Sequence, residues 1–226
     1  MNLKGHRVVK APPSVYYIPE FITLEEEERI IERVNSAPKP KWTQLSHRRL
    51  QNWGGIPHPK GMIAEKIPEW LLVFTEKIGK LGLFGGKQPN HVLVNEYMPG
   101  QGIMPHLDGP LFYPTVTTIS CGSHTILNCY CPHQSDEADT QSVGDLKVAS
   151  LLLERRSLVV LQDDMYTEYL HTIAEVHCDT VSGAEENLDL CGGQYATGAE
   201  LQRTTRISLT VRHVPHTTKV CIKLGR

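Results

Sequence analysis

The alternation of apolar and polar positions divides the chain into a helical first part and a strand-rich second part. Between residues 24 and 34, apolar side chains recur at helical spacing. Thr23 precedes this stripe, and Glu26 follows three positions later, which is the pattern of a capping box. A second helical stripe begins at Pro68, a residue suited to a first helical position, and ends before a glycine pair at 85–86. The pattern therefore predicts two helices, each with one buried face.

From about residue 91 the pattern changes to short apolar runs that are separated by turn residues. These runs predict strands over residues 91–97, 115–120, 125–131, 149–153, 157–161, 170–176 and 206–214. A short edge strand is also expected at 15–19. Short strands at this density are typical of an antiparallel barrel or jelly-roll. Two polar segments, 133–147 and 179–202, interrupt the series, and we expect both to be mobile surface loops.

These elements predict an α+β fold that is mainly β. We expect a double-stranded β-helix (jelly-roll) core with the N-terminal helices packed on one sheet. The length of 226 residues suits one domain, and no linker-like composition divides the chain. The predicted domain therefore spans 1–226, with its helical part at about 10–90 and its β core at 91–220.

Composition excludes several classes of protein. Hydrophobic residues make up 40% and charged residues 21%, which is typical of a globular chain and not of a disordered or fibrous one. No apolar run approaches the ~18–20 residues of a membrane helix, and the N-terminus lacks the apolar core of a secretory signal. The six cysteines include no C-x-x-C pair, so neither a zinc ribbon nor a thioredoxin-like site is indicated. Reduced thiols in the cytoplasm or nucleus are expected.

Positive charge is concentrated between residues 33 and 64, although the net charge of the chain is −2. This basic strip contains no acidic residue, and tryptophans and histidines are interleaved with its cations. Such a mixture can hold a phosphate backbone and stack on bases. Most charge runs are simply solvated, however, so composition alone favours a solvated loop region with a few buried tryptophans.

The first candidate for chemistry is the triplet His106-Leu107-Asp108. On a strand, residues two apart face the same side, about 6.6–6.8 Å apart along the chain. An imidazole and a carboxylate so placed can converge on one cation. With a second histidine from a distant strand they form the facial triad of non-heme Fe(II) oxygenases.

Two further motifs accompany this triplet. Asn95-x-Tyr97 lies upstream, and Arg206 and Arg212 lie six residues apart on one face of a predicted strand. Each motif alone is unspecific, but all three in this order on predicted strands are much less common by chance.

The second histidine should lie at least about 40 residues beyond the triplet, because several strands and turns separate the two in this fold. This spacing excludes His124 and disfavours His133. His171 and His177 remain as candidates.

In this order the motifs resemble those of the AlkB-like Fe(II)/2-oxoglutarate-dependent dioxygenases, over roughly residues 10–220. The family pattern N-x-Y-x-x-G, H-x-D, distal histidine and R-x₅-R is matched by Asn95–Gly100, His106–Asp108, His171 and Arg206–Arg212. The family's strand, turn, strand and histidine order favours His171 over His177. The family often has a glycine after this histidine, where the present chain has Thr172. Segments 38–45 and 50–55 most resemble the subgroup of the sixth eukaryotic AlkB homologues.

The resemblance implies a set of cofactors and ligands. The implied Fe(II) ligands are His106, Asp108 and His171. The implied residues for the cosubstrate 2-oxoglutarate are Asn95, Tyr97, Arg206, Ser208 and Arg212, with Arg206 on its distal carboxylate. O₂ is the oxidant, and the implied reaction releases formaldehyde, succinate and CO₂ from an N-methyl group. The protein's own part is to orient the reactants and exclude water.

The resemblance also places a nucleotide-recognition lid in the basic strip. The leading hypothesis is therefore an oxidative demethylase of N-alkylated bases in RNA or DNA, which inserts an unstacked base into its pocket. The candidate nucleic-acid contacts are Lys39, Lys41, Arg48, Arg49, Trp53 and Tyr113, with Phe112 as a further stacking residue. We expect a monomer in cytoplasm and nucleus that does not bind membranes.

Three alternatives remain open from the sequence. A hydroxylase or demethylase of a protein side chain would have the same iron site. A nucleic-acid-binding module with weak turnover comes from another functional class. A zinc hydrolase fits less well, because a zinc site does not explain Asn95, Tyr97 and the two arginines.

Overall fold

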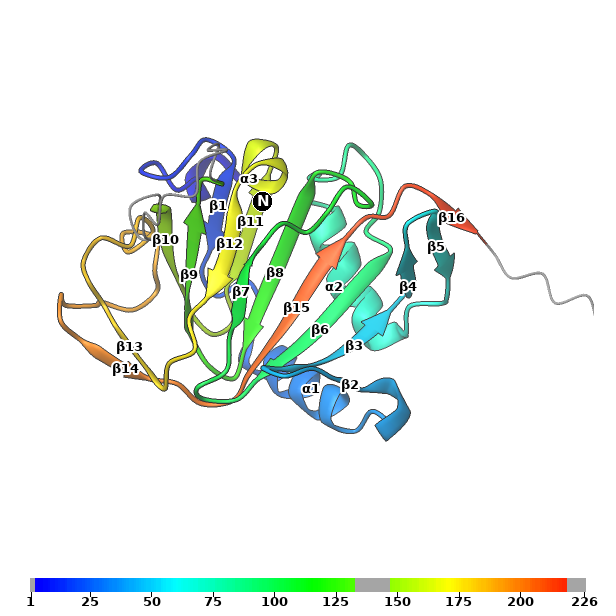
Figure 1. Cartoon of the computed structure of the whole chain (residues 1–226), viewed down its shortest axis with the longest axis horizontal. Helices are drawn as coiled ribbons and strands as arrows, with labels where there is room; N and C mark the ends of the chain where they lie inside the picture. The colour runs from blue at the N-terminus through cyan, green and yellow to red at the C-terminus, as the bar shows by residue number, and fades with distance from the viewer. Residues whose placement is uncertain (1–2, 133–146, 219–226) are drawn as a thin grey trace, which may run out of the picture.

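The computed structural model describes residues 3–132 and 147–218 (Figure 1). The helices are α1 (Leu24–Asn35), α2 (Glu69–Gly79) and α3 (Asp164–Thr167), with 3₁₀ turns η1 (Leu3–His6) and η2 (Lys39–Lys41). The strands are β1 (Val15–Ile18), β2 (Thr43–Gln44), β3 (Arg49–Trp53), β4 (Gly55–His58), β5 (Gly61–Ala64), β6 (His91–Tyr97), β7 (Ile103–His106), β8 (Thr115–Cys121), β9 (Thr125–Tyr130), β10 (Lys147–Leu153), β11 (Leu158–Gln162), β12 (Leu170–Ile173), β13 (Cys178–Thr180), β14 (Glu200–Gln202), β15 (Arg206–Arg212) and β16 (Thr217–Thr218).

Two antiparallel sheets form the core of the molecule. The major sheet has the order β1-β11-β8-β15-β6-β3-β2, and the minor sheet has the order β10-β9-β12-β7. Helices α1 and α2 cover the outer face of the major sheet (Figure 1). The predicted mainly-β fold with N-terminal helices on one sheet is confirmed.

Most predicted strands match observed ones to within about two residues, but three regions differ. The predicted strand at 170–176 ends at Ile173, and four strands in the basic strip, β2 to β5, were not expected. Of the polar segment 133–147, only Lys147 lies within the described residues, where it begins β10.

The second polar segment, 179–202, is more than a surface loop. It contains the strand pair β13–β14, and Asn187 within it is fully buried. The Asn187 side chain accepts a hydrogen bond from Leu152 N at 2.8 Å and donates one to Leu152 O at 2.9 Å. The side chain thus attaches the segment to β10, which a polar composition does not indicate.

Helix α1 begins as the sequence predicts. Thr23 and Glu26 form both hydrogen bonds of the capping box, and Ile30 and Val34 are buried against the major sheet. Glu27 is fully buried although it is charged, because Arg155 donates to it at 2.6 Å and Gly122 N at 2.8 Å. An ion pair and a backbone hydrogen bond therefore fix α1 to the sheet below it.

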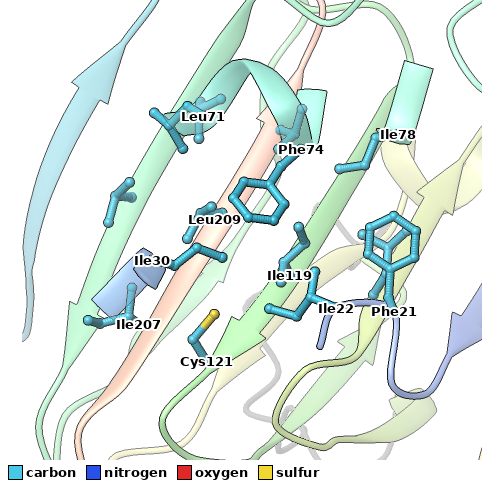
Figure 2. Close-up of a cluster of buried hydrophobic side chains, with 14 of the residues drawn as sticks. Phe21, Ile22, Ile30, Leu71, Phe74, Ile78, Ile119, Cys121, Ile207 and Leu209 are labelled. Atoms are coloured by element: carbon cyan, nitrogen blue, oxygen red, sulfur yellow. The ribbon is translucent and has the colours of Figure 1, made fainter. Parts of the chain in front are cut away.

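Helix α2 buries the predicted apolar stripe but has different ends. Pro68 is the N-cap and not the first helical residue, and the helix ends at Gly79, before the glycine pair. Figure 2 shows Leu71 and Phe74 of α2 over the major sheet, close to Leu209 of β15. This layer is the first of two hydrophobic cores, and the second lies between the sheets.

Strand β15 separates these two cores. Ile207, Leu209 and Val211 belong to the layer under the helices. The intervening residues point to the other side, because successive side chains of a strand face opposite directions. These residues are Arg206, Ser208, Thr210 and Arg212, and they line a cavity between the sheets.

A small third sheet, with the order β16-β5-β4, lies beside the two main sheets (Figure 1). Strand β16 pairs with β5 in parallel, and Met62 N donates to His216 O at 2.9 Å. The β4–β5 hairpin is thereby braced by a segment that follows the last strand of the core.

Two further observations concern membrane helices and thiols. Within the described residues, no helix is long and apolar enough to cross a membrane. The five described cysteines, Cys121, Cys129, Cys131, Cys178 and Cys191, are all free thiols.

Candidate metal and cosubstrate site

Two histidines and one aspartate meet at one end of the cavity. His106 is the last residue of β7, and His171 is its cross-strand partner on β12. One ligand atom from each of His106, Asp108 and His171 can be chosen such that all three lie within 4.8 Å of one another. The two imidazole rings have centroids 4.3 Å apart. This spacing can hold one metal ion.

Asp108 is brought close to the two histidines in a different way from the predicted one. Strand β7 ends at His106, so the two side chains do not share a face of one strand. Asp108 lies in the irregular segment beyond the strand, where Arg212 of β15 donates a hydrogen bond to its Oδ1. The major sheet therefore orients a carboxylate that stands opposite the two histidines of the minor sheet.

The structure brings His171 and not His177 into the group. His177 is exposed and lies next to Gly100, where an added Cβ would stand 2.7 Å from its Nε2. Burial lowers the pKa of His171 to about 4, against an opposing effect of Asp108. At neutral pH the His171 imidazole is therefore uncharged, the form that binds metal ions.

The adjoining cavity has a volume of about 210 Å³. One wall is polar and comes from neighbouring strands of the major sheet: Asn95 and Tyr97 on β6, and Arg206, Ser208, Thr210 and Arg212 on β15. The apolar part of the lining includes Leu127 and Leu153 of the minor sheet, and Val159 and Leu161 of β11 in the major sheet. The structure thus brings all five residues proposed for the cosubstrate to one cavity.

Arg206 lies at the inner end of this polar wall. Its guanidinium is buried and donates to Ser120 Oγ at 2.9 Å. Burial lowers its pKa to about 10, so Arg206 remains a cation at neutral pH. Ser120 was not among the predicted site residues, and the sequence does not distinguish it from the other hydroxyl residues of β8.

Several buried polar atoms at the site fit a metal ion and an acid. Within the part of the chain that the structure describes, Asp108 Oδ2, Arg206 Nε and Arg212 Nε have no hydrogen-bond partner. Buried polar atoms are normally satisfied, so such a group points to a ligand. A carboxylate oxygen beside two imidazoles suits a divalent cation, and guanidinium N–H groups suit a carboxylate.

The structure does not bring the predicted nucleic-acid contacts together at one place. Arg48 lines the cavity, and Arg49 forms two hydrogen bonds with Glu96, at 2.6 and 2.8 Å. Lys41 stands 4.2 Å from the Trp53 ring and 3.9 Å from Glu65. Lys39 is exposed on η2.

The structure does not bring the rings of Trp53 and Tyr113 to the cavity. Trp53 meets Trp70 edge to face at 5.8 Å and packs against the core under the helices. Tyr113 packs against Phe84 at 6.2 Å. Both rings pack against the apolar layer, where they act as core residues. Phe112 instead lies 4.7 Å from the Arg212 guanidinium, close to Asp108.

A second hollow reaches the site from outside. This groove of about 520 Å³ is lined by Pro57, His58, Pro59, Lys60 and Gly61 of the β4–β5 hairpin, by Pro110, Leu111 and Phe112, and by His216. Asp108 lines both the groove and the cavity. The hairpin was not among the predicted site elements, although its two prolines and Gly61 indicate a turn.

The fold and site agree with known proteins. A sequence profile described as "2OG-Fe(II) oxygenase superfamily" matches residues 36–212. The chain belongs to this superfamily, and the membership implies Fe(II) and 2-oxoglutarate as its cofactor and cosubstrate. The protein is therefore an oxidoreductase of the dioxygenase type.

Individual relatives place the chain among the AlkB homologues. It is 55% identical over 227 residues to "Probable RNA/DNA demethylase ALKBH6" of Danio rerio, covering 100% of this chain and 96% of that protein. It is 28% identical to the mouse "tRNA (carboxymethyluridine(34)-5-O)-methyltransferase ALKBH8", covering 77% of this chain and 26% of that protein. The solved structure of OsALKBH1 shares the fold, with a TM-score of 0.59, 16% identity, and coverage of 89% and 98%. The resemblance seen in the motifs is confirmed.

Proposed function

We propose that this dioxygenase is an oxidative demethylase of N-alkylated bases in RNA or DNA. The observation that carries the proposal is the convergence of His106, Asp108 and His171 between a cationic cavity and an external groove. The full-length similarity to a probable RNA/DNA demethylase supports the choice of substrate.

In this proposal, His106, Asp108 and His171 hold Fe(II). When bound, iron and 2-oxoglutarate supply the activation of O₂ that oxidises the C–H bond of an N-methyl group. Arg212 fixes the Asp108 carboxylate by a hydrogen bond to Oδ1, and the second oxygen, which has no hydrogen-bond partner among the described residues, would be free to bind the metal.

The polar wall of the cavity binds the dicarboxylate cosubstrate. Arg206 has a free Nε and pairs with one carboxylate, beside Tyr97 and Ser208. Asn95 stands opposite Ser208, and Arg212 lies at the other end of β15, where it contacts Asp108. The apolar part of the lining keeps the cavity poor in water, which strengthens each of these charge interactions.

The methylated base approaches through the groove that Asp108 shares with the cavity. Phe112 lines this groove beside the site, and Lys60 lies on the hairpin across from it. An aromatic face and a cation at the mouth suit a nucleobase and its phosphate.

The test of this function is a panel of methylated RNA and DNA oligonucleotides analysed by mass spectrometry, with succinate and formaldehyde measured in parallel. We expect loss of the methyl group with stoichiometric formation of both products. His106→Ala and His171→Ala are expected to abolish turnover and metal binding, and His177→Ala is the matched control that retains both.

The same assay tests the competing functions. Succinate formation that peptides stimulate and oligonucleotides do not would replace the proposal with a protein hydroxylase or demethylase. Oligonucleotide binding without any stimulated turnover would replace it with a binding module.

A further inference from the structure

The turn between β2 and β3 carries Arg48 to the cosubstrate cavity. Arg48 is half-buried and lines the cavity together with Asn95 and Tyr97. Its Nε donates a hydrogen bond to Asn95 Oδ1 at 3.2 Å. The residue before it, His47, lies 3.1 Å from Glu175 in the segment after β12. The turn therefore contacts both the wall of the cavity and the segment that follows β12, the strand of His171.

The hydrogen bond from Arg48 fixes the orientation of the Asn95 amide. A side-chain amide offers an oxygen acceptor on one side and two N–H donors on the other. Because the Asn95 oxygen accepts the hydrogen bond from Arg48, the two N–H groups on Asn95 Nδ2 are free to donate to another acceptor. Among residues 3–132 and 147–218, none accepts a hydrogen bond from Nδ2. Asn95 lines the cavity, so these donors can reach a ligand that is bound there.

Arg48 also differs from its neighbour in charge balance. Arg49 is neutralised by the two hydrogen bonds with Glu96. Arg48 forms no salt bridge with any acid in the described part of the chain, and the same is true of Arg206. Burial raises the pKa of the Tyr97 hydroxyl, and the three guanidiniums of Arg206, Arg48 and Arg212 oppose this effect. Two unneutralised guanidiniums thus act on one small cavity, which suits a ligand with two carboxylates.

We propose that Arg48 is a positioning residue of the cosubstrate pocket, which orients Asn95 toward a carboxylate of 2-oxoglutarate and adds a third positive charge to the pocket. The β2–β3 turn is then part of the cosubstrate site and not only of a nucleic-acid surface. This inference rests on the superfamily's use of 2-oxoglutarate and does not require that the oxidised substrate is a nucleobase.

The experiment measures cosubstrate binding without turnover. The full chain is loaded with Mn(II), and the affinity for 2-oxoglutarate is measured by isothermal titration calorimetry in the absence of any methylated substrate. We expect Arg48→Met to weaken the affinity at least about tenfold, because a charged hydrogen-bond donor and its orienting effect are both lost. Arg48→Lys keeps the charge and is expected to recover about half of this loss on a logarithmic scale. Lys66→Met removes an exposed charge and serves as the matched control.

A double-mutant cycle separates positioning from simple attraction. If Arg48 acts through Asn95, the loss in Arg48→Met with Asn95→Ala is clearly smaller than the product of the two single losses. Independent losses, with the full product observed, overturn the positioning role.

Two further outcomes overturn the whole inference. One is unchanged 2-oxoglutarate affinity in Arg48→Met and Arg48→Lys proteins that melt as cooperatively as the parent. The other is weaker oligonucleotide binding with unchanged 2-oxoglutarate affinity, which assigns Arg48 to the nucleic-acid surface. If Arg48→Met fails to fold, the Arg48→Lys comparison alone decides.

Discussion

His91 shows how the fold determines the charge of a single buried side chain. It lies at the start of β6, opposite Arg212 on β15, and its Nε2 is 3.2 Å from Asn52 Oδ1. Burial lowers the pKa of His91 to about 3, and the nearby Arg212 adds to this effect. The imidazole therefore stays neutral at every pH at which the protein is expected to work, and it puts no second charge beside the Arg212–Asp108 pair.

The neutral state of His91 predicts a loss of stability in acid. Below pH ~6.5 the unfolded chain binds a proton on this side chain, and the folded chain does not until about pH 3. The free energy of unfolding should fall by about 2 kcal/mol from this group alone between pH 6.5 and 5. His91→Gln, which keeps a polar side chain opposite Asn52, should flatten the decline in urea denaturation at these two pH values.

The exposed His177 provides the control for this measurement, since its substitution by glutamine should leave the pH dependence as in the parent. A decline of equal steepness in His91→Gln and in the parent would show that His91 does not remain neutral in the folded state.

Individual residues also show how far sequence patterns reach. The residues that the structure brings together at the candidate site, His106, Asp108, His171, Arg206 and Arg212, were singled out from spacing and resemblance. Arg48 was assigned to nucleic acid because it lies in a basic strip, and the structure places it in the cavity. Charge composition reports that a segment is basic, but only the path of the turn determines where each cation points.

At the scale of elements, the alternation of apolar and polar residues predicted those strands whose two faces lie in different environments. Strand β15 has one face under the helices and one in the cavity, and the major strands around it were found for the same reason. Strands β2 to β5 were missed, because they contain prolines, glycines and cations with little alternation. The pairing that joins them to the core is long-range: β3 aligns with β6, so that Leu50 stands opposite Asn95. Such a pairing cannot be inferred from local sequence.

A substitution of Asn187 tests whether this side chain attaches the segment 179–202 to β10. Replacement by alanine leaves the N–H and the C=O of Leu152 without these partners, within the buried strand β10. We expect Asn187→Ala to lower the free energy of unfolding by about 3 kcal/mol. Asp189→Ala, at an exposed position close by, should change it by less than about 0.5 kcal/mol in the same denaturant titration. Equal effects of both substitutions would show that the segment is not attached through Asn187.

At the scale of the whole molecule, the site joins the two sheets. His106 and His171 come from the minor sheet, and Arg206 and Asn95 come from the major sheet. A metal ion with a dicarboxylate beside it would connect groups that the polypeptide otherwise joins only through turns and apolar packing. Ligand binding should therefore stabilise the molecule as a unit.

The expected result is a melting temperature that rises with Mn(II) and rises further when 2-oxoglutarate is added. At 100 times the dissociation constant, a ligand specific for the folded state contributes about 2.7 kcal/mol. Differential scanning fluorimetry measures both steps. Arg206→Met should abolish the second step and preserve the first, and a variant that retains both steps would contradict the assignment of Arg206 to the dicarboxylate.

The pairing of β16 with β5 has a practical consequence for work with this protein. The hairpin that borders the groove is held in part by the chain after His216, so material clipped by a protease near that point would keep its core while one side of the groove lost its support. Preparations for substrate screening are therefore better checked by intact mass before weak turnover is attributed to the wrong nucleotide.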